Sequence, residues 1–149
     1  MKKIAVALLA VGVLWQARAA DVDLNWLTSL PQAQAQAKAE HKLVLMDFTG
    51  SDWCPWCIKL DRETFSQPAF ADYAKTNLVL VLVDFPNHQP QPEALQKANQ
   101  DLEKKYDPEG ALPTIIAMKP DGTVVMSQVG YLPGGPAAMI AKLNQARNQ

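Results

Sequence analysis

The stretch that decides the fold is residues 48–59, which read Phe-Thr-Gly-Ser-Asp-Trp-Cys-Pro-Trp-Cys-Ile-Lys. It contains the chain's two cysteines, Cys54 and Cys57, and it follows an apolar run over residues 43–48 that is typical of a buried strand. The spacing places both sulfurs on one side of the first turn of a helix, close enough to form a disulfide. A C-x-x-C pair where a strand gives way to a helix is the arrangement that dithiol redox chemistry requires.

The start of the chain has the pattern of a secretory signal peptide. A pair of lysines precedes an apolar run over residues 4–15, and small residues lie at the −3 and −1 positions of a cleavage point after Ala19. The apolar run is shorter than the roughly 20 residues that cross a bilayer. We therefore expect residues 1–19 to be removed on export to the periplasm, with no stable membrane insertion afterwards, and residues 20–149 to form the mature protein.

Composition excludes several classes of protein. At 149 residues, with 48% hydrophobic and 19% charged residues, the chain fits one globular domain with a core of its own. The formal net charge is −1, and it becomes about −4 without residues 1–19, which carry three basic and no acidic residues. This charge gives no support for a nucleic-acid partner or an anionic membrane surface.

Export changes the meaning of the cysteine pair. In an oxidising compartment, paired cysteines usually form structural disulfides. A loop closed across two residues, however, removes little entropy from the unfolded chain and joins no distant elements. We therefore interpret the Cys54–Cys57 pair as redox-active.

Metal binding is the main alternative use of the two thiols. Zinc or copper delivery would need further ligands, and the chain offers His41 and His88, neither clearly placed near the cysteines. Covalent haem attachment requires histidine directly after the second cysteine, and Ile58 stands there.

Strand patterns alternate with helix patterns, which predicts an α/β domain with a mixed sheet. Strands are expected over residues 43–48, 78–85, 114–118 and 123–129. Helices are expected over residues 32–40, 55–65, 69–76, 93–106 and 137–146. Residues 21–30 have an amphipathic pattern that predicts a short helix or turn, and together with the helix over residues 32–40 they would form an extra N-terminal helical segment.

Trp53 stands directly before the C-x-x-C pair, and Leu112-Pro113-Thr114 stands before the third expected strand. With these motifs, the order of elements resembles the thioredoxin superfamily. The FTGSDWCPWC stretch and the later Glu63-Thr64-Phe65 are similar to the exported, single-domain thioredoxin-like proteins of bacteria. The resemblance covers nearly all of the mature chain. It implies a thioredoxin-like fold, with a central mixed sheet flanked by helices, and disulfide exchange with protein thiols and disulfides, without a metal or organic cofactor.

The resemblance also implies roles for particular residues. Cys54 would be the exposed nucleophile, Cys57 the more buried resolving thiol, and Asp47 the buried acid that assists proton transfer. Pro113 would be a cis-proline against the disulfide, and Leu112 would offer backbone hydrogen bonds to an extended substrate. The chain departs from thioredoxin in one extra residue between Asp47 and Cys54, and in Pro-Trp between the cysteines.

Elementary chemistry favours the same order of events. The N-terminus of a helix stabilises a thiolate through unpaired N–H groups and the helix dipole, so Cys54 is expected to ionise before Cys57. Cys54 would attack a substrate disulfide, and Cys57 would then attack the sulfur of Cys54 and release the reduced substrate. The reverse sequence oxidises a substrate. We favour a reductase that is recycled by an unidentified redox partner.

The residues around the cysteines are expected to form the substrate-binding surface. Trp56 lies between the thiols, where burial is difficult, so it is expected to contact a substrate or partner. Trp53 and Pro55 complete this surface, although Trp53 is expected to pack mainly into the core beside the turn. Asp52 is expected to serve as a turn or cap residue. A second hypothesis is a redox-linked binding module, in which docking of a partner is primary and turnover secondary.

Overall fold

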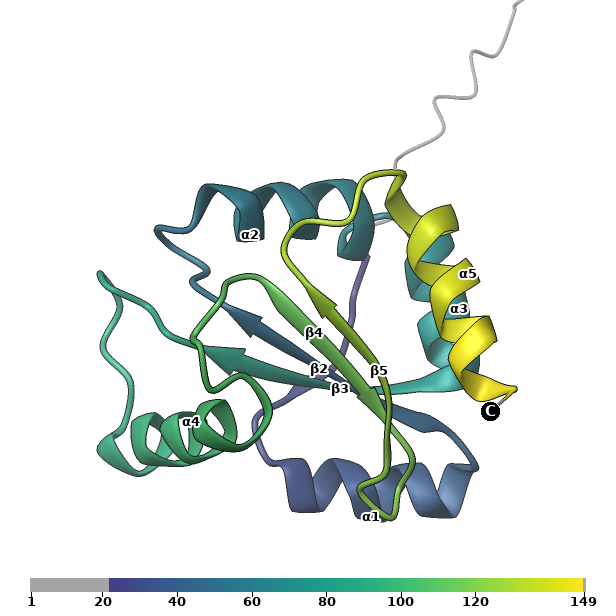
Figure 1. Ribbon diagram of the computed structural model, residues 1–149, viewed down its shortest axis with the longest axis horizontal. Helices are drawn as coiled ribbons and strands as arrows, with labels where there is room; N and C mark the ends of the chain where they lie inside the picture. The colour runs from purple at the N-terminus through teal and green to yellow at the C-terminus, as the bar shows by residue number, and fades with distance from the viewer. Residues whose placement is uncertain (1–21, 149) are drawn as a thin grey trace, which may run out of the picture.

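The computed structural model describes residues 22–148, so the expected signal peptide lies outside the described residues. Five strands form one sheet in the order β1-β3-β2-β4-β5 (Figure 1). Their bounds are β1 Trp26–Leu27, β2 Leu43–Thr49, β3 Leu78–Asp84, β4 Thr114–Met118 and β5 Val124–Val129. Strand β3 runs parallel to β1 and β2, whereas β4 runs antiparallel to β2 and β5. The prediction of a mixed sheet in an α/β domain is confirmed.

Helices cover both faces of this sheet, with α2 above it and α1 below it in Figure 1. The helical segments are α1 Leu30–Glu40, α2 Pro55–Leu60, η1 Asp61–Phe65, α3 Pro68–Asn77, α4 Glu93–Tyr106 and α5 Gly135–Arg147. Helix α1 starts where the sequence indicates, because the Ser29 side chain accepts a hydrogen bond from the Gln32 N–H and Pro31 occupies the first turn. No helix within residues 22–148 is both long enough and apolar enough to cross a membrane.

One local expectation is wrong, and a second is confirmed in its bounds but not in its helix type. Trp26–Leu27 is a strand paired with Leu80–Val81 of β3, not a helix or turn, because the open edge of β3 offers main-chain partners that periodicity cannot reveal. The helix expected over residues 55–65 changes at Asp61 into a π-helix, in which the Ser66 N–H reaches back five residues to the Asp61 carbonyl at 2.8 Å. The wider turn places Phe65 in the core, where it is 1% exposed.

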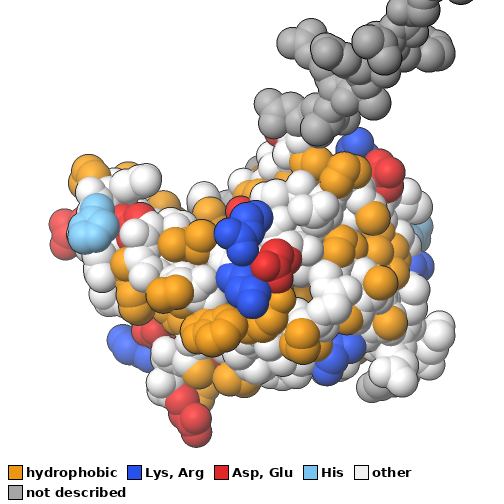
Figure 2. Space-filling model, turned by 90° about the horizontal axis from the view of Figure 1, so that it is seen from above, with side chains coloured by type: hydrophobic (Ala, Val, Ile, Leu, Met, Phe, Trp, Pro, Cys, Tyr) orange, Lys and Arg blue, Asp and Glu red, His pale blue; other side chains and the backbone are white. Residues whose placement is uncertain are grey.

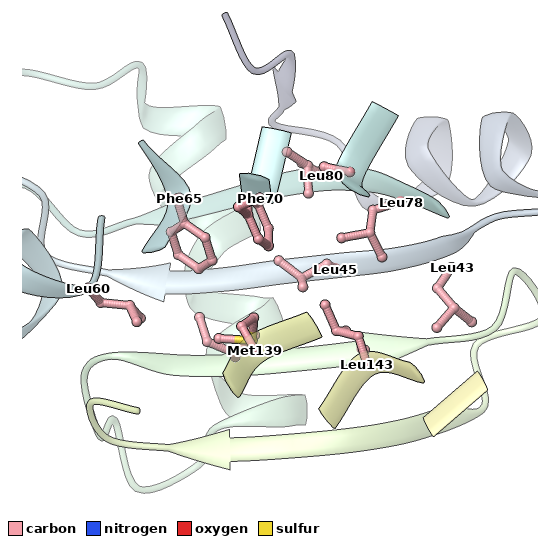
Figure 3. Packing of buried hydrophobic residues seen from close by; sticks show 12 residues of the cluster. Leu43, Leu45, Leu60, Phe65, Phe70, Leu78, Leu80, Met139 and Leu143 are labelled. Carbon is pink, nitrogen blue, oxygen red and sulfur yellow. The ribbon is translucent and has the colours of Figure 1, made fainter. Parts of the chain in front are cut away.

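The alternation of side chains along β2 divides the core into two layers. Val44, Met46 and Phe48 face the layer under α1. Leu43 and Leu45 face the other layer, where Leu45 lies among side chains from α2, η1, α3 and α5 (Figure 3). Those neighbours include Leu60, Phe65, Phe70, Met139 and Leu143. Asp47, two residues beyond Leu45, therefore belongs to the face that α2 covers.

Candidate active site

The turn between β2 and α2 is tied to the chain that leaves β3. The Ser51 N–H and hydroxyl donate hydrogen bonds to the Asp84 carboxylate at 3.0 and 2.6 Å. The Asp52 carboxylate accepts from the backbone N–H groups of Asn87 and His88 at 2.9 and 2.7 Å. Strands β2 and β3 are parallel, so their carboxyl ends meet at one edge of the sheet, where open α/β sheets place their sites. Asp52 is thus a structural turn residue, as expected.

Cys54 and Cys57 form a disulfide at the start of α2, with their Cα atoms 5.2 Å apart. Cys54 is the N-cap of the helix, Pro55 is its first residue, and the Cys54 Sγ accepts a hydrogen bond from the Cys57 N–H at 3.2 Å. The expected contrast between an exposed and a buried thiol is wrong for this oxidised state. Cys54 is 5% exposed and Cys57 3% exposed, because the disulfide draws both sulfurs against the first turn.

Pro113 reaches this site from β4. The Leu112–Pro113 peptide bond is cis, as predicted. The register of β2 and β4 ends with Phe48 opposite Thr114, so the buried Pro113 lies at the same end of the sheet as the cysteine turn. The Pro113 carbonyl accepts a hydrogen bond from the Gly130 N–H at 2.8 Å, which joins this segment to the end of β5.

Asp47 is a buried carboxyl beneath α2. It is 5% exposed and stands opposite Ile115 of β4, and its Oδ1 atom has no hydrogen-bond partner within the described residues. Loss of solvation raises the pKa of Asp47 to about 8, and the negative charges of Asp61 and Asp84 act in the same direction. Such a carboxyl holds a proton at neutral pH and can exchange it near that pH, which suits proton transfer.

The two tryptophans form the outer rim of the site. Trp53 is 43% exposed, so the expectation of core packing is wrong. Its ring lies across Gly50, where a Cβ atom would come within 2.6 Å of Cε2, and its Nε1–H donates to the Phe85 carbonyl at 2.7 Å. That polar anchor lies outside the core, which explains the exposure. Trp56 is 55% exposed, in agreement with its position between the cysteines.

Tyr131, an aromatic neighbour of Trp56, was not predicted from the sequence to belong to the site. The rings of Trp56 and Tyr131 lie 5.5 Å apart, and the Lys59 Nζ stands 5.4 Å from the first ring and 4.8 Å from the second. The Tyr131 hydroxyl donates to the Glu63 carboxylate, which raises the pKa of Tyr131. Figure 2 shows this face above α2, with charged side chains beside hydrophobic ones. Residue 131 lies in a Gly- and Pro-rich segment that predicts only a loop, so no local signal indicated it.

The two histidines differ in their distance from the cysteines. His41 ends α1 and is separated from the turn by the length of β2, about 23 Å for seven residues. His88 lies closer than the sequence indicated, because its N–H bonds to Asp52. Within residues 22–148, no three His, Cys, Asp or Glu side chains are grouped to hold a metal ion.

Comparisons with known proteins agree with this geometry. The chain is 35% identical over 127 residues to the disulfide bond reductase DsbH of Chlamydia pneumoniae, over 85% of this chain and 75% of that protein. It is 34% identical over 113 residues to the thiol:disulfide interchange protein DsbD of Klebsiella pneumoniae, over 76% of this chain, but it spans only 17% of DsbD.

Solved structures give the same result. A DsbH oxidoreductase structure superposes with a TM-score of 0.79 at 34% identity, over 93% of this chain and 95% of that chain. The oxidised C-terminal domain of Neisseria meningitidis DsbD superposes with a TM-score of 0.57 at 22% identity, over 78% and 90% of the two chains, which shows a shared fold. Residues 30–147 match the family model described as a thioredoxin-like domain. The chain therefore belongs to the thioredoxin-like domain family, as a thiol:disulfide oxidoreductase with the Cys54–Cys57 pair.

Proposed function

We propose that this protein is an exported disulfide reductase, with Cys54 as the attacking thiol and Cys57 as the resolving thiol. The observation that carries the proposal is the Cys57 N–H donating to the Cys54 Sγ at the start of α2, in a chain 35% identical to a disulfide bond reductase. The same N–H would stabilise a Cys54 thiolate in the reduced protein. Cys57 has no equivalent position, because it lies within the helix.

The reaction begins from the dithiol form. The Cys54 thiolate attacks one sulfur of a substrate disulfide, forms a mixed disulfide and releases the first substrate thiolate. The Cys57 thiolate then attacks the Cys54 sulfur, which forms the Cys54–Cys57 disulfide and releases the second substrate thiolate. The substrate gains two electrons and two protons, and a recycling dithiol partner must return two electrons to the protein.

Asp47 has a role in the second step. The Cys57 thiol must lose a proton before it attacks, and strand alternation places Asp47 on the same face of β2 as Leu45, which belongs to the core cluster that includes Leu60 of α2. With its pKa raised to about 8, the Asp47 carboxyl accepts and releases a proton near neutral pH, by direct contact or through water. Only the ionised form of Asp47, about a tenth of the molecules at pH 7, accepts the proton of the resolving thiol, so this step should speed up as the pH rises toward 8.

The substrate chain lies between the two sides of the rim. Pro113 and the Leu112 backbone, which lie at the same end of the sheet as the cysteine turn, would form the β4 side of this surface, and Trp53, Pro55 and Trp56 would form the helix side. An extended segment next to the substrate cysteine would pair with the Leu112 backbone and pack its side chains on the exposed indole rings.

Two cysteine variants test the proposal. Cys54→Ser is expected to reduce the turnover of a model peptide disulfide to the uncatalysed background. Cys57→Ser is expected to accumulate a mixed disulfide with the same peptide, seen as a mass increase that dithiothreitol reverses. Full activity of Cys54→Ser, measured by reduction of the peptide and by complementation, would instead favour the binding-module hypothesis.

The direction of electron flow is tested by equilibration in glutathione buffers. A reductase is expected to have a reduction potential near the thioredoxin value of about −270 mV, whereas a disulfide donor lies near about −120 mV. The export part of the proposal rests on residues 1–19, and it predicts that the mature protein recovered from a periplasmic fraction starts at Ala20, as read by intact mass. A cytoplasmic protein with residues 1–19 retained would contradict that part alone.

A further inference from the structure

A cleft of about 280 Å³ lies beside the cysteine turn, on the side of Trp53. Trp53, Phe85 and Pro86 form part of its lining, and five residues with side-chain amides, from the loop after β3 and from α4, form the rest. These amides belong to Asn87, Gln89, Gln91, Gln96 and Gln100. Among the residues that the structure describes, no charged side chain lines the cleft. Helix α4 and the loop before it stand at the side of the sheet away from α3 and α5 (Figure 1).

The walls of the cleft are held in place by bonds to the active-site turn and to β3. The Trp53 Nε1–H bonds to the Phe85 carbonyl at 2.7 Å, and Asp52 accepts from the next two backbone N–H groups of the loop. The Gln91 amide donates to the Asp84 carbonyl at 3.3 Å, and the Gln96 amide donates to the Gln91 carbonyl at 3.0 Å. The loop therefore keeps its shape next to the cysteine turn.

Three of the amides remain free to bind. Within residues 22–148, the side chains of Asn87, Gln89 and Gln100 make no hydrogen bond, although all three are exposed and face the same cleft. Each primary amide offers two donors and an acceptor. A peptide backbone offers one donor and one acceptor per residue. The side-chain amides of the cleft can therefore pair with backbone N–H and C=O groups, and no charged group is needed.

We propose that this cleft is a subsite for an uncharged, extended polypeptide segment of the substrate, close in the chain to the cysteine that Cys54 attacks. This identification of the ligand rests on the proposed function. Trp53 directly precedes Cys54, so a chain lying on the indole reaches the disulfide within a few residues. The segment's main chain bonds to the free amides, and its side chains pack on the Trp53 ring.

The cleft also separates two kinds of disulfide substrate. A peptide extending into the cleft gains contacts with Gln89 and Gln100, whereas a small organic disulfide reacts at Cys54 without reaching them. The two glutamines therefore act as specificity residues for polypeptides. They do not take part in the sulfur chemistry.

The test uses Gln89→Ala/Gln100→Ala, because neither amide bonds to any other part of the chain that the structure describes, and the double variant is therefore expected to stay folded. Gln145→Ala, an exposed glutamine of α5 remote from the cleft, is the matched control. The first readout is NMR titration of the full chain with a capped, cysteine-free peptide of glycine, serine and asparagine. We expect saturable shifts of the cleft amides and of the Trp53 indole, and binding about tenfold weaker in the double variant only.

The second readout compares the turnover of two substrates. One is a disulfide of the same peptide extended by a cysteine, and the other is the small compound 2-hydroxyethyl disulfide. The double variant is expected to lose about tenfold in kcat/KM for the peptide, through KM, and nothing for the small disulfide. Equal losses on both substrates, or no loss on either, overturn the subsite.

The two proposals fail separately. If the wild-type protein reduces neither disulfide, the proposed function is wrong, and the NMR titration still decides whether the cleft binds peptide. If a neutral oligosaccharide shifts the cleft resonances and the peptide does not, the cleft is a carbohydrate site and the polypeptide subsite is wrong.

Discussion

The disulfide separates two very different surroundings. Behind it, Asp47 is almost fully enclosed, one of its oxygens has no hydrogen-bond partner within the described residues, and its pKa is raised to about 8. In front of it, Trp53 and Trp56 are each about half exposed, and polar or charged groups hold their rings. The buried Asp47 carboxyl, at the back of the disulfide, can gain or lose a proton, but its packing is fixed. The exposed rings of Trp53 and Trp56, at the front, can move to new contacts without burying a charge.

This difference indicates a division of labour. A buried carboxyl affects the stability of the whole domain, because its ionisation is coupled to unfolding. The rim tryptophans are open to solvent, so changes to their supports should alter local order and substrate contact more than stability. Changes at the back should therefore have the larger thermodynamic effect, and the following predictions test that order.

The largest effect is expected for Asp47→Asn. Between about pH 4 and pH 8 the unfolded wild-type chain loses the Asp47 proton while the folded chain keeps it, so the free energy of unfolding falls by about 1.4 kcal/mol per pH unit. Near pH 7 the accumulated loss is on the order of 4 kcal/mol. Asn cannot ionise, so this fall should be absent in the variant. Urea unfolding of both oxidised proteins at a series of pH values measures it.

The informative quantity in this experiment is the difference between the two pH profiles. The buried amide adds an offset of its own, but that offset does not change with pH. If the two profiles run parallel from pH 4 to pH 8, Asp47 is already ionised in the folded protein. The proposed difference between a protonated, buried Asp47 behind the disulfide and an exposed tryptophan rim in front of it would then be wrong.

A smaller effect is expected for Gly50→Ala at the front. The added Cβ would lie 2.6 to 2.9 Å from Cε2, Nε1 and Cζ2 of Trp53, so the ring must shift. Such overpacking typically costs about 1–3 kcal/mol, and the shift should also break the bond from Nε1 to the Phe85 carbonyl. Urea unfolding and the indole N–H resonance of Trp53 report the two consequences.

The matched control is the same substitution in a Trp53→Ala background. The three atoms nearest to the new Cβ all belong to the Trp53 ring, so without the ring the cost should largely disappear in a double-mutant cycle. A cost that persists without Trp53 would assign the effect to the backbone of the turn, and the rim would then be less independent of the fold than the comparison indicates.

Much of this arrangement could be predicted from the sequence, and the exceptions share a cause. Local periodicity was sufficient for β2 and β3, and the C-x-x-C spacing was sufficient for the redox pair. The cis bond before Pro113 was implied instead by the resemblance to the thioredoxin superfamily. Strand β1 was missed because two residues carry no period. The exposure of Trp53 depends on the Phe85 carbonyl, and the support of Trp56 depends on Tyr131, each far away in the chain. Side-chain partners across such distances follow from the fold, not from local pattern.

A local effect is expected for Glu63→Gln, which tests the support of Trp56. The Glu63 carboxylate accepts from the Tyr131 hydroxyl and disfavours a negative tyrosinate, so its removal should lower the pKa of Tyr131 toward the ordinary value. NMR titration of the Tyr131 ring carbons in the wild-type protein and in the variant measures this difference. An unchanged Tyr131 titration would mean that the pair does not persist in solution, and Trp56 would then lack this part of its support.

The smallest effect is expected for Lys59→Met, which keeps the length of the side chain but removes its charge. The Lys59 Nζ lies over both rings of the Trp56–Tyr131 pair, and an exposed cation–π contact is weak because water competes for the ammonium. The substitution should increase the mobility of the Trp56 indole in NMR relaxation, while kcat/KM for a peptide disulfide changes by less than about twofold. A large loss of activity with unchanged indole mobility would place Lys59 in the chemistry of the thiols rather than in the rim. In that case the front of the disulfide, like the back, would act on the reaction through charge.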